Sequence, residues 1–147
     1  MIEGYFAQPF GRPFLRATVV VPRLRVQWEV SFVVDTGADR TTSMPTDAAR
    51  LGLDDLARRS RITVAGVGGY AQYFTEPGGL LLRESNGTIQ VLSLEFLIAE
   101  SESDFGYIPS FVGRDVLNRC RILYDPTRSR LRVKVVSSDA VIGAPQD

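Results

Sequence analysis

The stretch Phe32–Asp39 has the sequence F-V-V-D-T-G-A-D, in which an apolar run ends on a carboxylate and a glycine turn follows at once. Upstream of Asp35, apolar and polar residues alternate strictly from Val26 to Val34. Alternation with a period of two predicts a half-buried strand, whose apolar face comprises Val26, Trp28, Val30, Phe32 and Val34. We therefore expect a strand that ends at Asp35, with Trp28 and the phenylalanines in the core.

The segments around this strand predict two hairpins. Phe14–Val21 is rich in β-branched and apolar residues, and Pro22 separates it from Val26–Val34, so the two segments are expected to pair. Further on, Arg61–Val64 and Tyr70–Thr75 are short extended segments on either side of the glycine-rich sequence A-G-V-G-G. This pattern predicts a second hairpin with a glycine tip.

A third hairpin is predicted from Leu80–Arg83 and Thr88–Ile98. The dipeptide Asn86-Gly87 lies between them, and it favours the two positive φ angles of a type I′ turn. Arg121–Tyr124 and the alternating Leu131–Val135 predict two more strands towards the C-terminus. Lys134, the one lysine, then falls on the solvent face of its strand, which argues against a catalytic role.

Helical stretches are expected to be few and short. Ala48–Leu51 is one, with Thr46 as its N-cap and Gly52 as its stop. Arg114–Arg119 is another, and the tail from Ser137 is expected to be frayed. Many short strands with few helical residues predict an all-β fold, a closed or nearly closed small β-barrel.

The length of 147 residues and a hydrophobic content of 44% predict one globular domain over residues 1–147, with a core at about 12–136 and short flexible tails. Lys+Arg and Asp+Glu both number 17, so the net charge is zero and no basic track for nucleic acid or an anionic membrane is present. The sequence has neither a signal peptide pattern nor an apolar run long enough to span a bilayer. We expect a cytoplasmic protein without nucleic-acid or membrane partners.

The chain has no histidine, which excludes several chemistries. Ser-His and Cys-His catalysis need an imidazole, and zinc sites are usually built from His and Cys. We therefore expect neither a metal site nor a cofactor. The acidic segment from Ala99 to Asp104 is expected to be a solvated loop, because it lacks the ligand spacing of an EF-hand. The single Cys120 lies between two arginines that would lower the pKa of an exposed thiol, but a small apolar side chain is the favoured interpretation.

Alone, D-T-G is consistent with an ordinary turn. Two further segments, A-G-V-G-G-Y (residues 65–70) and S-F-V-G-R-D-V-L-N (residues 110–118), follow it in order. Together the three motifs resemble the retropepsin-like (retroviral-type) aspartic protease family, and the chain resembles a single-domain, bacterial-like member. The resemblance extends over roughly Arg12–Tyr124.

The resemblance implies that Asp35 is the catalytic aspartate of a peptide hydrolase. Two carboxyl groups held together cannot both ionise, so one acts as base on a water while the other donates to the scissile carbonyl. The sequence contains no second D-T-G or D-S-G, so the partner carboxylate is expected from Asp35 of another copy, across the two-fold axis of a homodimer.

Other roles follow from the same resemblance. Thr36 and Gly37 complete the catalytic motif, Ala38 and Asp39 are expected to contact the substrate backbone, and Arg114 is expected to pair with Asp39 with Gly113 beside it. The flap over the peptide would comprise Gly66, Val67, Gly68 and Gly69, although an ordinary β-hairpin with a glycine bulge also fits these residues. Arg12-Pro13 is loosely similar to an N-terminal Arg-Pro of viral members.

The sequence departs from the viral pattern in three places. Arg40 stands where an acid is common, and the continuation Thr41-Thr42-Ser43 is more polar than usual. Leu131–Val136 extends past the point where viral members end, so the dimer interface is not carried over. An active aspartic endopeptidase is the favoured function; a catalytically silent peptide-binding or dimerisation module and a fold with D-T-G as a plain turn remain alternatives.

Overall fold

The computed structural model describes residues 1–50, 61–66, 69–99 and 108–143. The strands are β1 (Ile2–Glu3), β2 (Tyr5–Ala7), β3 (Arg12–Val21), β4 (Val26–Val34), β5 (Thr42–Ser43), β6 (Arg61–Gly66), β7 (Gly69–Arg83), β8 (Ile89–Ala99), β9 (Phe111–Val112), β10 (Cys120–Asp125), β11 (Arg130–Val135) and β12 (Ala140–Ile142). The α-helices are α1 (Pro45–Arg50) and α2 (Arg114–Leu117), and the 3-10 turns are η1 (Pro22–Leu24) and η3 (Pro126–Arg128). Within these ranges no helix has the length and apolar character to cross a bilayer.

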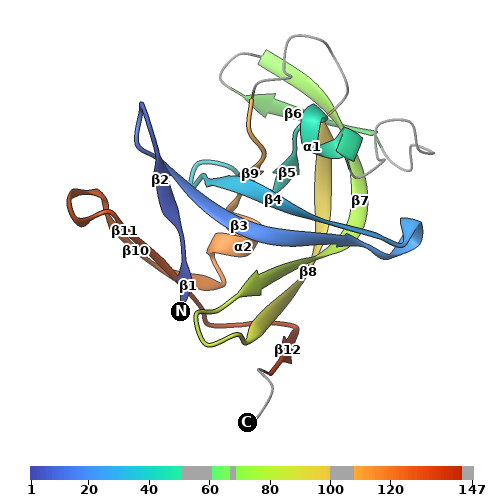
Figure 1. The fold of residues 1–147 in the computed structure, drawn as a ribbon. Coiled ribbons are helices and arrows are strands. Elements are labelled where there is room, and N and C mark those ends of the chain that lie inside the picture. Colours follow the sequence, from blue (N-terminus) through green and yellow to red (C-terminus); the bar gives the residue numbers. More distant parts are fainter. Residues whose placement is uncertain (51–60, 67–68, 100–107, 144–147) are drawn as a thin grey trace.

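Most of the strands form a closed ring (Figure 1). β3 pairs with β4 and β7, β7 pairs with β8, β8 pairs with β5, and β9 links β5 back to β4. A ring leaves few backbone groups unpaired at its edges. The all-β, closed architecture that the sequence predicted is confirmed, and so are the first two predicted hairpins, β3–β4 and β6–β7.

Alternating apolar residues of the long strands fill the inside of the ring. Their side chains are nearly inaccessible to solvent, as the pattern of period two predicts. The largest fully buried side chains are Phe32, Phe96, Ile2, Leu15, Leu80, Leu82, Leu92, Leu131, Val19, Val21 and Val112. The core was expected at about residues 12–136. Ile2 precedes this range, but its side chain belongs to the hydrophobic core.

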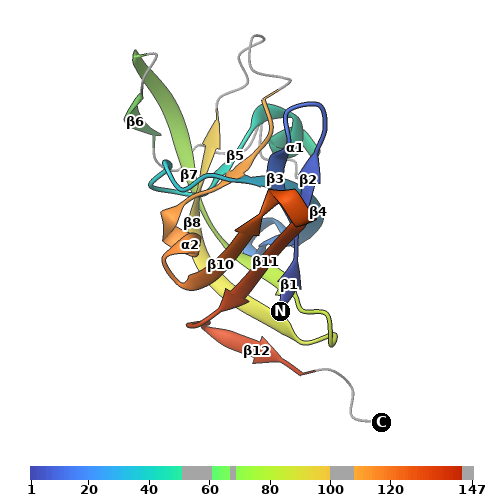
Figure 2. The ribbon, with the colours of Figure 1, turned by 90° about the vertical axis from the view of Figure 1, so that its left-hand side faces the viewer.

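A three-stranded sheet, in the order β1-β11-β10, lies beside the ring (Figures 1 and 2). β11 pairs antiparallel with both neighbours. Its Val133 lies opposite Ile2 of β1 on one side and opposite Ile122 of β10 on the other. Leu131 and Val133 point into the core while Lys134 is exposed, as its strand pattern predicted.

β7 differs from the expectation, because it runs unbroken from Gly69 to Arg83 through Pro77-Gly78-Gly79. A side chain at position 78 would not fit: an added Cβ would lie 2.6 Å from the carbonyl oxygen of Val20 and 2.8 Å from the ring of Phe96. Gly78 therefore allows β3 and β8 to approach β7 closely, and the strand continues through residues that look like a break in the sequence.

The turn between β7 and β8 is also of another type than predicted. Gly87 has a φ of 89°, but Asn86 is not among the residues with positive φ, so the type I′ turn was wrong. The Gly87 N–H donates to the Glu84 carbonyl, and the Asn86 Oδ1 accepts from the Thr88 N–H. This is a three-residue loop with a glycine in the left-handed region at its end.

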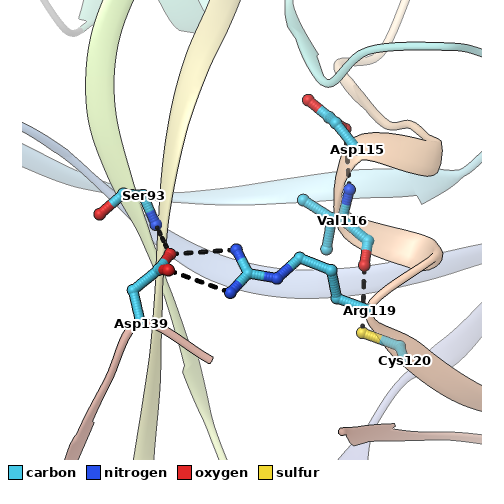
Figure 3. Close-up of polar contacts among 6 residues, drawn as sticks. All are labelled: Ser93, Asp115, Val116, Arg119, Cys120 and Asp139. Atoms are coloured by element: carbon cyan, nitrogen blue, oxygen red, sulfur yellow. Dashed lines mark hydrogen bonds and ion pairs between the residues drawn. The ribbon is translucent and has the colours of Figure 1, made fainter. Parts of the chain in front are cut away.

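The prediction of a frayed tail from Ser137 was wrong. β12 pairs antiparallel with β8, and Asp139 anchors it (Figure 3). The Asp139 carboxylate accepts two hydrogen bonds from the Arg119 guanidinium, at 3.0 and 3.1 Å, and one from the Ser93 N–H, at 2.7 Å. These hydrogen bonds lower the pKa of Asp139 below its usual value, and those from Arg119 have the largest effect.

Two aromatic residues expected in the core are exposed. Trp28 lies opposite the buried Val19, so its face is as predicted, but 47% of it is accessible. The reason is that β9 pairs with β4 only at Val33 and Val34, so within the described residues the edge of β4 that faces away from β3 has no partner strand beside Trp28. Phe10, in the turn between β2 and β3, is 79% exposed.

The remaining expectations concern helices and loops. α1 begins at Pro45, so Thr46 lies inside its first turn and is not the N-cap. α2 and the strands β10 and β11 confirm the predicted C-terminal elements. Gly52 and the acidic residues 100–104 lie outside the described residues.

Gly78 and Gly79 offer a matched test of the close approach. We expect Gly78→Ala to lower the free energy of unfolding by about 1–3 kcal/mol, because its methyl group would overlap backbone and a packed ring. Gly79→Ala should change it by less than about 1 kcal/mol, since the nearest atom to its Cβ would lie at 3.7 Å. Urea denaturation of both variants measures the difference, and equal midpoints would contradict the interpretation.

Candidate active site

Asp35 directly follows β4, at the start of a tight turn. Its N–H donates to the Val112 carbonyl of β9 at 3.0 Å, and its carbonyl accepts from the Ala38 N–H at 3.3 Å. The Gly37 N–H donates to Oδ1 of Asp35 at 2.9 Å, while the residue stays partly accessible. The turn therefore orients one carboxylate oxygen and leaves the group open to the solvent side.

β9 supports this turn from the far end of the chain. It pairs in parallel with β4, Val33 opposite Phe111 and Val34 opposite Val112. Gly113, the next residue, lies against the backbone of Arg40, where an added Cβ would come within 2.6–2.8 Å. Gly113 is therefore required by its close packing against the backbone of Arg40.

Arg114 reaches from the start of α2 to the turn that contains Asp35. Its Nη1 donates to the Thr36 carbonyl at 2.8 Å, and its guanidinium pairs with the Asp39 carboxylate, so the predicted ion pair is present. The Arg114 side chain is 40% exposed and that of Asp39 is 84% exposed. In a single chain the pair is a surface ion pair of small energy.

Asp115, which the sequence analysis did not single out, makes the buried hydrogen bonds of the site. Its carboxylate accepts from the Thr41 N–H at 2.9 and 3.0 Å and from the Thr41 hydroxyl at 2.7 Å. The same hydroxyl accepts from the Gly113 N–H at 3.2 Å, and Thr41 is fully buried. Asp115 thus links the loop after D-T-G to α2. In the sequence, the polar run Thr41-Thr42-Ser43 was the feature that indicated a hydrogen-bonding partner for this loop.

Of the polar residues after Arg40, the buried Thr41 and Thr42 have hydrogen-bonded hydroxyls, whereas the buried Ser43 hydroxyl has no hydrogen-bond partner among the described residues. The Thr42 hydroxyl donates to the Arg40 carbonyl at 3.2 Å. Ser110, which is completely buried, accepts from the Met44 N–H at 2.9 Å and donates to the Asp47 carboxylate at 2.5 Å. The departure from the more apolar viral pattern therefore corresponds to a second set of contacts between β5, α1 and the segment ahead of β9.

Of the four residues predicted as a flap, the structure describes Gly66 and Gly69, which lie at the end of the hairpin β6–β7. Gly66 and Gly69 face each other at the end of the ladder, so the predicted hairpin exists. Val67 and Gly68 lie outside the described residues. The hairpin extends from the ring at its upper end in Figure 1.

Cys120 is not an activated nucleophile. Burial raises the pKa of its thiol to about 11, although Arg119 acts in the opposite direction. Its Sγ donates to the Val116 carbonyl at 3.4 Å (Figure 3).

Within the described ranges, no group of three or more His, Cys, Asp or Glu side chains is arranged to hold a metal ion. The guanidinium of Arg12, from the Arg12-Pro13 pair that is loosely similar to an Arg-Pro of viral members, lies over the ring of Phe10.

Comparison with solved structures identifies the fold. A retropepsin-like aspartic protease from Rickettsia conorii aligns with a TM-score of 0.54 and 18% identity, over 89% of this chain and 96% of that chain. EIAV protease in complex with the inhibitor HBY-793 aligns with a TM-score of 0.49 and 19% identity, over 76% of this chain and 90% of that chain. No model of a known family and no curated protein matches the sequence. The chain therefore has the retropepsin-like fold, as its sequence predicted.

The carboxylates of Asp39 and Asp115, which lie in or against the loop that begins at Asp35, should differ in their contribution to stability. We expect Asp115→Ala to lower the free energy of unfolding by about 1–3 kcal/mol, because it leaves the buried N–H and hydroxyl of Thr41 without their acceptor. Asp39→Ala should cost less than about 1 kcal/mol, because its ion pair is exposed. Chemical denaturation checks both values, and a larger loss for Asp39→Ala would contradict this ranking.

Cys120 should react slowly with thiol reagents in the folded protein. Because the thiolate is the reactive form, alkylation by iodoacetamide at about pH 8 should be at least about tenfold slower than in urea-unfolded protein. Mass spectrometry of the alkylated fraction over time gives both rates. Equal rates would show that the thiol is open to solvent.

Proposed function

We propose that the chain is an aspartic endopeptidase that hydrolyses peptide bonds with a water activated by two Asp35 carboxylates, one from each copy of a homodimer. The observation that supports this most directly is the geometry of Asp35, a partly accessible carboxylate with one oxygen fixed by the Gly37 N–H. The sequence supplies one such motif per chain, so a second copy is needed to complete the site. The retropepsin-like fold agrees with this reaction.

The proposed chemistry needs one proton shared by two carboxyl groups. The charged carboxylate takes a proton from water, and the water oxygen attacks the carbonyl carbon of the peptide. The neutral carboxyl donates its proton to the carbonyl oxygen, which gives a tetrahedral diol. When the C–N bond breaks, the protonated carboxyl gives its proton to the nitrogen, the other carboxylate takes a proton from one hydroxyl of the diol, and the dyad again holds a single proton. The dyad requires neither a histidine nor a metal ion.

The neighbouring residues have supporting roles in this proposal. Thr36 would bridge the two catalytic loops with its hydroxyl, and its carbonyl is already held by Arg114. Ala38 and Asp39 would contact the peptide backbone. Gly66, Val67, Gly68 and Gly69 would close over the peptide as a flap, since a glycine-rich hairpin tip permits the backbone changes that closure requires.

The test is cleavage of a mixed peptide library across pH by the wild type, Asp35→Asn and Glu29→Gln. Asp35→Asn keeps the shape of the side chain but removes the base, so activity should fall by at least about a thousandfold while fold and association stay unchanged. Glu29→Gln, a matched change of an exposed carboxylate in β4, the strand that precedes Asp35, should retain activity. Circular dichroism and sedimentation verify fold and mass.

The pH profile should have a maximum under mildly acidic conditions. Activity should fall at high pH, when the shared proton leaves, and at very low pH, when the base becomes protonated. A peptide with a hydroxyl at the scissile position should inhibit, because it mimics the tetrahedral diol. Cleavage by wild type and Asp35→Asn alike would contradict the proposal. No cleavage by either would favour the catalytically silent peptide-binding or dimerisation module.

A further inference from the structure

Three cations of β11 point away from the core. Leu131 and Val133 are fully buried, so the residues that alternate with them lie on the other face of the strand. These residues are Arg130, Arg132 and Lys134. No run of basic residues marks them in the sequence, which is why the linear pattern predicted no anionic partner.

The neighbouring strands add to the same face of the small sheet. Residues directly opposite each other in an antiparallel ladder share a face. Arg121 of β10 lies opposite Lys134, and Leu123 lies opposite Arg132. Leu123 is 45% exposed, so an apolar side chain lies among the cations. We call this surface the basic face, and it comprises Glu3, Arg121, Leu123, Asp125, Arg130, Arg132 and Lys134.

The two carboxylates of the basic face neutralise only part of its charge. Oε1 of Glu3 lies 3.1 Å from Nε of Arg132. Asp125 lies 4.0 Å from Arg128, which belongs to the η3 turn between β10 and β11. The other cations of the face are exposed and form no ion pair with another described residue. They are Arg121, Arg130 and Lys134.

The basic face is turned towards solvent and its charges lie close together. Figure 2 shows β10 and β11 in front of the ring, and in Figure 1 their hairpin projects beyond it. Neighbouring strands are about 4.8 Å apart, and alternate residues of one strand are roughly 7 Å apart. Both spacings are shorter than the Debye length of about 8 Å at physiological ionic strength. The cations therefore act on a partner together.

We propose that the basic face binds an anionic lipid surface. The cations would contact the headgroups, and Leu123 would reach the boundary between headgroups and acyl chains. Basic side chains are attracted to anionic lipids, and an apolar side chain among them adds the burial of apolar area. The binding is peripheral and does not depend on peptidase activity, since Asp35 takes no part in it.

Two other anionic partners would use the charges of the basic face but not its apolar residue. Single-stranded nucleic acid binds proteins largely by stacking on aromatic rings, and none of the residues that form this face is aromatic. The phosphates of a duplex, or the carboxylates of an acidic peptide, would pair with the cations and leave Leu123 in water. A lipid surface offers both anionic groups and an apolar layer, so it matches the whole face.

The first test is sedimentation of the full chain with lipid vesicles. The wild type should bind vesicles of equal parts phosphatidylglycerol and phosphatidylcholine at least about tenfold more strongly than vesicles of phosphatidylcholine alone. Raising the salt concentration from about 0.05 M to about 0.5 M should weaken this binding by at least about tenfold, because salt screens exposed charges.

The second test reverses one charge at a time. Lys134→Glu should lower the partition coefficient onto the anionic vesicles by at least about tenfold. Arg25→Glu makes the same change of charge in the turn between β3 and β4, on the opposite side of the molecule in Figure 1, and should lower it by less than about threefold. Circular dichroism verifies that both variants are folded.

The third test concerns the apolar residue. Leu123→Ser should weaken binding to the anionic vesicles by at least about threefold, because it removes the side chain that is buried in the lipid. Val141→Ser is the matched control, since Val141 of β12 is 55% exposed and lies outside the basic face. It should leave the partition coefficient unchanged.

The outcomes separate a lipid surface from the other partners. A wild type that does not bind the anionic vesicles at low salt overturns the proposal. Equal losses for Lys134→Glu and Arg25→Glu would show an attraction spread over the whole molecule, and they overturn the assignment to this face. Tighter binding to duplex DNA or to polyglutamate than to vesicles, lost in Lys134→Glu, would keep the face but overturn the lipid as its partner. None of these results bears on peptide cleavage by Asp35.

Discussion

The hydrogen bonds between Asp115 and Thr41 are the interaction on which the site depends. They join residues 74 positions apart, and their donors are buried, so each would lose a partner without compensation from water if the contact broke. The contact fixes the loop that begins at Asp35 against the helix that follows β9. The Asp115 hydrogen bonds hold this loop in place, and the exposed ion pair between Arg114 and Asp39 then helps to orient its surface residues.

A single carboxylate on a rigid turn constrains what the fold can do chemically. The Gly37 N–H fixes one oxygen of Asp35, and the parallel pairing of β4 with β9 fixes the backbone on which it sits. A turn of this rigidity suits a dyad that must hold one proton between two groups, because electrostatic catalysis depends on groups that are already in position.

Local patterns predicted the strands and the turn that follows β4, and contacts distant in sequence explain what these patterns missed. Alternation placed Trp28 on the inner face correctly, but its exposure depends on where β9 ends, which lies far along the chain. In the sequence, Asp115 is an ordinary acidic residue of a short helix. Its role depends on the contact with Thr41, which is distant in the sequence. The tail after Ser137 has no strand pattern of its own and is ordered by β8 and by the pair of Asp139 with Arg119.

The pairing of β1 with β11 has a consequence for how the molecule folds. Ile2 lies opposite Val133, so the small sheet needs residues from both ends of the described chain, and the side chain of Ile2 stays exposed to water until that contact forms. The entropy of closing so long a loop must be met before the contact contributes any stability. Folding is therefore expected to be slow and cooperative, with the small sheet assembled only when the ring is already compact.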